Sequence, residues 1–251
     1  MRSDDRLTAA LSGGAGRLVA LPIGALARRL GGKPMHPRGA VFDAVLERYG
    51  SGSDRGVPWL DEAATEPAVV RLSRGAGLPA PLPDLLGLAV RLPGDGSPVD
   101  LLLTTTGRGP LSRLLPLPRR DSAAVYSSIM AYRSDAGSLR LAALPEAGRM
   151  PSEPVPLAGA VRRAGLRFSL AVARGTGPWQ PFATLTLTEP VPALDPDVRF
   201  DAVQNPPPGL VPDGPMARFR APSYARARAA RTAVVGDTGA GRKGDDRRPG
   251  Q

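Results

Sequence analysis

The chain contains no cysteine and only one histidine, His36, in 251 residues. Without cysteine it cannot form disulfides, cysteine-ligated zinc sites or iron–sulfur clusters, and it has no thiol nucleophile. A single histidine excludes hydrolases whose metal is held by several histidines, and no G-x-S-x-G run marks a serine nucleophile. A hydrolase is therefore the weakest of the functions considered for this sequence.

Long apolar runs are also missing, because no stretch approaches the roughly 18–20 apolar residues that span a membrane as a helix. Residues 1–32 include an apolar run, but Asp4 and Asp5 stand where a secretion signal is positively charged, and Pro22 and Gly24 interrupt the run. We therefore expect a cytoplasmic protein with no membrane span. We expect residues 1–32 to form an amphipathic arm that packs on the rest of the chain or on a partner subunit of a homo-oligomer.

Lysine is scarce, since only Lys33 and Lys243 accompany the arginines among the 33 basic residues. This bias, together with much alanine, glycine and proline, is typical of the GC-rich coding sequences of actinobacteria. The net charge of +10 is concentrated after residue 217. It attracts anions in general, but no basic patch interleaved with aromatics indicates a specific nucleic-acid partner.

Glycine and proline, with 30 and 29 residues, divide the sequence into short apolar runs that favour strands and turns. The runs typical of strands are residues 40–48, 68–73, 86–92, 99–106, 138–144, 166–173 and 182–188. Turn residues at 93–97 and 174–178 predict two hairpins. Residues 122–134 have helical spacing instead, with Val125, Ile129 and Met130 on one side.

Strands in consecutive pairs favour an antiparallel sheet closed into a barrel, because closure removes exposed strand edges. The predicted fold class is mainly β (α+β), with one barrel domain over residues 33–234 and peripheral helices. Residues 235–251 are rich in glycine, aspartate and arginine and are expected to be a disordered tail.

One short segment has the residue types of a cofactor site. Arg220 precedes Tyr224 by one helical turn, and Arg231 follows it by seven residues, so all three share a face of a helix. The charge of Arg220 favours the phenolate form of Tyr224, and a phenolate is a recognised axial ligand of haem iron. The same spacing is also that of an ordinary amphipathic surface helix.

Five segments, in the same order along the chain, resemble the haem catalase superfamily. Residues 200–212 and 220–224 are similar to the segment that carries the proximal tyrosine, F-x-P-x-N-x-x-P-G-I-x-P-S followed by R-x-F-S-Y. The other matches are residues 35–40 (MHPRGA) to V-H-A-K-G-A, 69–73 (VVRLS) to V-R-F-S, 83–92 (PDLLGLAVRL) to R-D-x-R-G-F-A-L-K-F, and 99–106 (VDLLLTTT) to W-D-L-V-G-N-N-T. The chain thus resembles a small, divergent catalase-like protein over roughly residues 33–231.

The resemblance implies a catalase-type barrel with a proximal C-terminal helix and a haem b cofactor. Tyr224 would be the iron ligand and Arg220 its charge partner, while His36 would be the distal acid and base. Ser73 would hydrogen-bond the imidazole and fix its tautomer. Residues implied to pair with the haem propionates are Lys33, Arg71 and Arg231. The implied reactants are a peroxide and an organic donor.

Several positions depart from the family. Thr104 replaces the distal asparagine that orients peroxide, Leu72 and Leu88 replace phenylalanines, and no aromatic follows Thr106 to stack on the haem. The resemblance therefore implies a peroxidase-like oxidoreductase with weak or no catalase activity. The alternative is a haem-free, degenerate catalase-fold protein that acts as a binding or interaction module.

Overall fold

The computed structural model describes residues 36–146 and 148–213. The expected arm at 1–32, the expected tail at 235–251 and the proximal C-terminal helix lie outside the described residues, as do Lys33, Arg220, Tyr224 and Arg231. The strands are β1 (Arg38–Arg48), β2 (Ala64–Arg74), β3 (Leu86–Leu92), β4 (Val99–Thr105), β5 (Tyr126–Ser127), β6 (Ala131–Ser134), β7 (Gly137–Pro145), β8 (Leu166–Arg174), β9 (Gln180–Pro190) and β10 (Val211–Asp213). The helices are α2 (Pro58–Asp61), the 3-10 turn η1 (Ser112–Leu114) and α3 (Pro154–Ala164).

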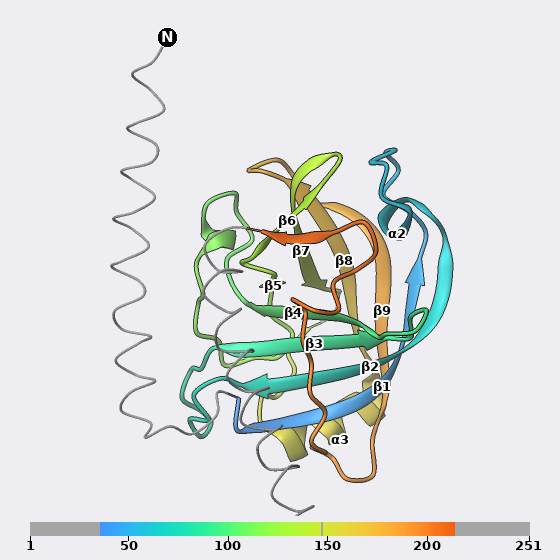
Figure 1. The fold of residues 1–251 in the computed structure, drawn as a ribbon. Helices are drawn as coiled ribbons and strands as arrows, with labels where there is room; N and C mark the ends of the chain where they lie inside the picture. Colours follow the sequence, from blue (N-terminus) through green and yellow to red (C-terminus); the bar gives the residue numbers. More distant parts are fainter. Residues whose placement is uncertain (1–35, 147, 214–251) are drawn as a thin grey trace, which may run out of the picture.

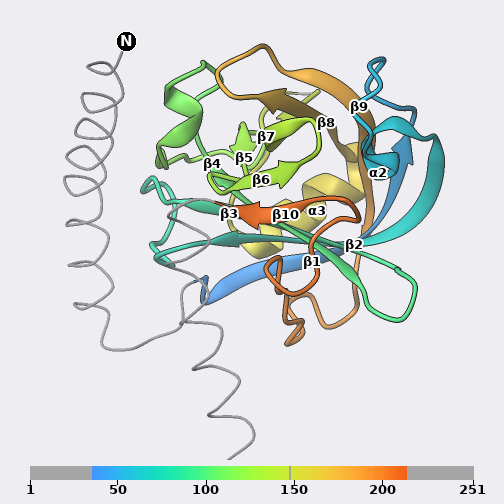
Figure 2. The same cartoon turned by 45° about the horizontal axis from the view of Figure 1, so that its top comes forward.

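Eight of the strands close an antiparallel β-barrel, as the sequence predicts. They pair in the order β7-β5-β4-β3-β2-β1-β9-β8, and β8 pairs again with β7 to complete the circle. β6 pairs with β7 beyond the short strand β5. β10 pairs with β6, and the two strands lie side by side in Figure 2. In Figure 1, β1 to β4 run side by side across the front of the barrel, with β8 and β9 behind them.

Successive side chains of the strands point alternately to an apolar interior and to an outer face. Phe42, Val70 and Leu88 come from three neighbouring strands, and each is at most 1% exposed in the interior. Tyr126 packs edge-on against Phe168, with ring centroids 5.8 Å apart, inside the same core. The alternate residues of each strand point outward, and the outer face that they form carries the candidate site.

Both predicted hairpins are present, because β3 pairs with β4 and β8 with β9 in antiparallel register. The helix predicted over residues 122–134 is wrong. That segment forms β5 and β6, and Ile129 between them has φ 48°, a value that no α-helix contains. Pairing with β7 overrides the local spacing, since Tyr126 and Ser127 lie opposite Ala143 and Ala142.

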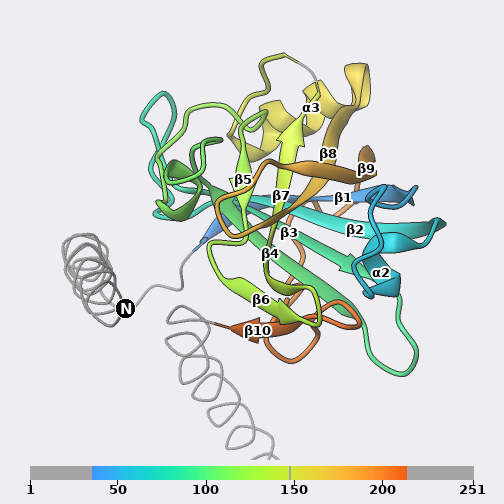
Figure 3. The same cartoon turned by 90° about the horizontal axis from the view of Figure 1, so that it is seen from above.

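The longest helix of the described residues, α3, was not predicted. Its first turn contains prolines, which usually indicate a turn or loop in a sequence. The first turn of a helix nevertheless accepts proline, because its N–H groups have no hydrogen-bond partner within the helix. Leu157, Ala158 and Val161 form its buried face within the barrel core. Figure 3 shows α3 at one end of the molecule, beside β9 and β1 and far from β10. Among the described residues, no helix has the length and apolar character needed to cross a membrane.

Candidate functional site

His36 lies immediately before β1 in a backbone conformation that side-chain-bearing residues rarely adopt. Its φ is 64°, in the left-handed region. Two hydrogen bonds hold this backbone in place: the His36 N–H donates to the Gly75 carbonyl at 2.9 Å, and the Arg71 guanidinium donates to the His36 carbonyl at 3.1 Å. Such strain persists only where surrounding contacts enforce it, and it concentrates at functional sites.

The His36 imidazole lies against β2 and β3. Its Nδ1 is 2.9 Å from Ser73 Oγ, so the hydrogen bond expected between these two residues is present. Glycine makes room for the ring, because a Cβ added at Gly87 would come within 2.6 Å of His36 Cε1. A Cβ at Gly75 would meet the same carbon at 3.5 Å. Position and orientation of the imidazole are therefore fixed by a serine on one strand and by the lack of a side chain on the next.

A row of small residues crosses the outer face of four strands beneath this imidazole. Gly39 of β1 lies opposite Ser73, Ser73 opposite Gly87, and Gly87 opposite Thr104 of β4. The structure therefore brings Thr104 to the same face as His36 and Ser73, one strand beyond Gly87. The Thr104 hydroxyl donates a hydrogen bond to the Leu86 carbonyl at 3.2 Å.

Arg71, expected to meet a haem propionate, binds a carboxylate of the chain itself. Its Nε and one terminal nitrogen donate to the two carboxylate oxygens of Asp195 at 2.7 and 3.0 Å. The Gly39 N–H donates to the same carboxylate at 2.8 Å. Asp195 was not predicted, since it lies 124 residues from Arg71 and belongs to no motif. The pair shows that this position recognises a carboxylate in a fork geometry.

A second network joins three of the segments quoted for the catalase resemblance, through Arg91, Asp100 and Asn205. Asp100 on β4 is fully buried and receives both arms of the Arg91 fork at 2.8 Å. It also accepts a hydrogen bond from the Asn205 amide at 3.0 Å, while its own N–H donates to the Asn205 carbonyl at 2.7 Å. The hydrogen bonds to the Asp100 carboxylate raise the pKa of Arg91, and this effect is larger than the opposing effect of burial. This network fixes the segment before β10 on the outer face of the barrel.

Two of the residues that the resemblance implies for the distal side of a haem, His36 and Ser73, lie in contact. Arg71, which it implies for a propionate, is bound to Asp195 instead. Residues 36–146 and 148–213 contain no group of three His, Cys, Asp or Glu side chains placed to hold a metal ion. Tyr224, the iron ligand that the resemblance implies, lies outside the described residues.

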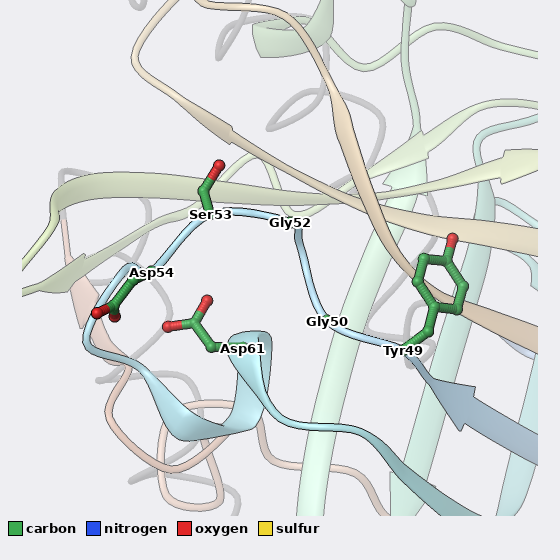
Figure 4. A pocket seen from close by; sticks show the side chains of 6 residues that line it. All are labelled: Tyr49, Gly50, Gly52, Ser53, Asp54 and Asp61. Carbon is green, nitrogen blue, oxygen red and sulfur yellow. The ribbon is translucent and has the colours of Figure 1, made fainter.

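A shallow hollow of about 330 Å³ lies between the end of β1 and α2, away from this site. Figure 4 shows its lining, with the Asp61 carboxylate turned toward the loop at Ser53 and Asp54. That carboxylate already accepts the Arg55 and Val57 N–H groups at 2.8 and 3.1 Å. The acidic side chain therefore stabilises its own loop.

The chain matches no family model and no curated protein sequence.

Proposed function

We propose that the outer face of β2 to β4 is the distal wall of a haem site and that the protein is a peroxide-using oxidoreductase. The observation that carries this proposal is the hydrogen bond of 2.9 Å between His36 and Ser73, made by a histidine with a left-handed backbone. A surface histidine gains nothing from such strain. A histidine that must present one ring nitrogen in a fixed direction does.

The chain's own residues supply the proton chemistry. When Nδ1–H donates to Ser73 Oγ, the lone pair of the imidazole is at Nε2, the nitrogen that Ser73 does not contact. Nε2 then takes a proton from one oxygen of a bound peroxide and returns it to the other oxygen as the O–O bond breaks. Haem, when bound, supplies the electrons for this cleavage. Ser73 keeps the ring in the tautomer that the transfer requires.

Thr104 favours peroxidase over catalase activity. Its hydroxyl is committed to the Leu86 carbonyl, and its side chain is shorter than the asparagine of the resembling family. Thr104 therefore orients a second hydrogen peroxide molecule less well than the asparagine would. Proton transfer by His36 does not need Thr104, so oxidation of an organic donor by peroxide is the reaction we assign.

A second candidate function is a haem-free binding module of the same fold. Arg71 favours it, because Asp195 already occupies both arms of the guanidinium fork. In that case the outer face would bind a carboxylate-bearing small molecule in exchange for Asp195. The two functions differ in one property, which is the presence of iron ligation by Tyr224.

The deciding experiment is an absorption spectrum of the full chain after titration with ferric haem. We expect a one-to-one complex with a high-spin tyrosinate spectrum in the wild type and its loss in Tyr224→Phe. Tyr49→Phe is the matched control, because Tyr49 is 55% exposed and remote from His36. His36→Ala should keep the haem spectrum and lose the reaction with peroxide. Equal haem binding by wild type and Tyr224→Phe would contradict the proposal.

A further inference from the structure

A second cluster of charged residues lies on the outer face of the barrel at β7, two strands beyond Thr104. The loop after β4 folds back over this face, and its turn η1 places Arg113 above β5, where the Ser127 hydroxyl donates to the Arg113 carbonyl at 2.8 Å. Ser127 lies opposite Ala142 of β7, and Arg140 is two residues along the same face of β7. Two arginines therefore converge beneath one loop.

The Arg113 guanidinium is held in place from two sides. It stacks on the Trp179 ring, with Cζ 4.1 Å from the ring centroid, and its Nε donates to the Gly109 carbonyl at 3.2 Å. Trp179 is itself fixed by a hydrogen bond from its indole nitrogen to the Arg108 carbonyl at 3.0 Å. Arg113 is only 2% exposed, so its direction is set by the fold.

Both arginines nevertheless lack partners for part of their hydrogen-bonding capacity. The terminal nitrogen NH1 of Arg113 and the Nε of Arg140 are buried and make no hydrogen bond to any residue that the structure describes. No Asp or Glu within 36–146 or 148–213 forms an ion pair with either of them. A buried donor without a partner is costly, and a charged one more so.

The two charges also oppose each other. Burial and the nearby charge of Arg140 lower the pKa of Arg113, and burial lowers the pKa of Arg140. A fold that holds two cations together without an anion loses stability unless an anion joins them.

We propose that Arg113 and Arg140 form a binding site for a phosphate-type oxyanion, either inorganic phosphate or the phosphate group of an ester. Two guanidiniums match the two negative charges of phosphate, and their unpartnered N–H groups match its oxygens. Trp179 and the η1 loop form the wall that holds Arg113 in the binding direction. The site is built on β5 and β7, the two strands that follow Thr104 across the same outer face, and the proposal does not require haem.

The test is thermal unfolding of the full chain in phosphate against chloride at equal ionic strength. We expect phosphate to raise the Tm of the wild type saturably, because a ligand that binds only the folded state stabilises it. Arg140→Gln should weaken the apparent phosphate affinity by about tenfold or more, the value of a lost charge-assisted hydrogen bond. In chloride alone Arg140→Gln should melt at a higher temperature than the wild type, because a like charge is removed.

The matched control is Arg133→Gln, which removes the same charge from an exposed residue of β6. It should respond to phosphate like the wild type. Acetate and glycerol 3-phosphate are the comparison ligands. Weaker binding of acetate than of phosphate supports a site for phosphate-type anions. Whichever of inorganic phosphate and glycerol 3-phosphate binds more tightly shows whether the site prefers the free ion or the ester. Absence of a saturable phosphate effect, or the same effect in Arg140→Gln, would overturn the proposal. Binding measured by phosphorus NMR gives the same comparison for Arg113→Gln if that variant folds.

Discussion

Arg71 and Asp195 are joined by two parallel hydrogen bonds of 2.7 and 3.0 Å, although 124 residues separate them in the chain. The pair fixes the segment after β9 on the outer face of β1 and β2. The same guanidinium donates to the His36 carbonyl, so it also supports the strained backbone of the candidate acid and base. Asp195 thus links the stability of the barrel to the geometry of the site.

Replacement of Asp195 by asparagine should weaken its interaction with Arg71. Both side chains are partly exposed, so we expect the free energy of unfolding to fall by about 1–2 kcal/mol, as measured in urea. Haem should bind more tightly to the variant, because Arg71 no longer has a competing carboxylate. Asp197→Asn, at an exposed position next in the same segment, is the control. Weaker haem binding by Asp195→Asn would show that Arg71 does not receive a ligand carboxylate.

Ser73→Ala should remove the hydrogen bond that orients the His36 imidazole without preventing haem from binding. Loss of a hydrogen bond that orients a catalytic or ligating histidine costs about 10–100-fold in activity or affinity. We expect this loss in the rate of peroxide reaction of the haem-loaded protein, with haem affinity unchanged. Because His36 is the only histidine, its imidazole resonance in NMR reports the change directly. Ser138→Ala, on the exposed face of β7, should change neither quantity.

Gly87→Ala tests whether the glycine floor positions the ring. The added Cβ would lie 2.6 Å from His36 Cε1 and 3.0 Å from Ser73 Oγ, so the imidazole has to move. We expect a displaced His36 resonance and a loss of about 1–3 kcal/mol in unfolding free energy, the usual cost of overpacking. At Gly148 an added Cβ meets nothing within 4 Å, so Gly148→Ala is the control. An unshifted resonance in Gly87→Ala would refute the role assigned to this glycine.

Thr104→Asn should raise the catalase reaction that we propose to be weak in the wild type. An amide that reaches a bound peroxide contributes a positioned hydrogen bond, and such bonds are worth on the order of 10²-fold in rate. We expect oxygen evolution from hydrogen peroxide to rise and oxidation of organic donors to remain. Thr65→Asn, at an exposed position of β2, is the control. Vigorous oxygen evolution by the wild type would contradict the assigned preference.

Asp100→Ala should be the most destabilising of these substitutions. It leaves Arg91 without its carboxylate and removes the acceptor of the Asn205 amide. Removing one partner of a buried ion pair typically costs about 3–5 kcal/mol. Chemical unfolding measures this loss, and Asp43→Ala at an exposed position of β1 should be nearly neutral. A loss below 1 kcal/mol, on the order of a surface pair, would show that the network contributes little.

Much of the fold could be predicted because barrel strands alternate between interior and outer face. Residues 86–92 were predicted as a strand and are β3 with the same bounds, and the turns at 93–97 and 174–178 join hairpins as expected. Of the candidate site, the hydrogen bond between Ser73 and His36 was expected from the resemblance and is present. The catalytic roles of His36 and Ser73, like the roles of the other implied residues, remain predictions.

By itself the sequence determined seven of the strands, the two hairpin turns and the antiparallel barrel, since these follow from alternation and from glycine and proline between apolar runs. Tertiary structure alone decided that residues 126–127 pair with β7, that His36 adopts φ 64°, and that Asp195 binds Arg71. The physical reason is how far apart in the sequence the contacting residues are. Local patterns record which side of a strand is buried, whereas a contact between residues 124 apart depends on the closure of the whole barrel.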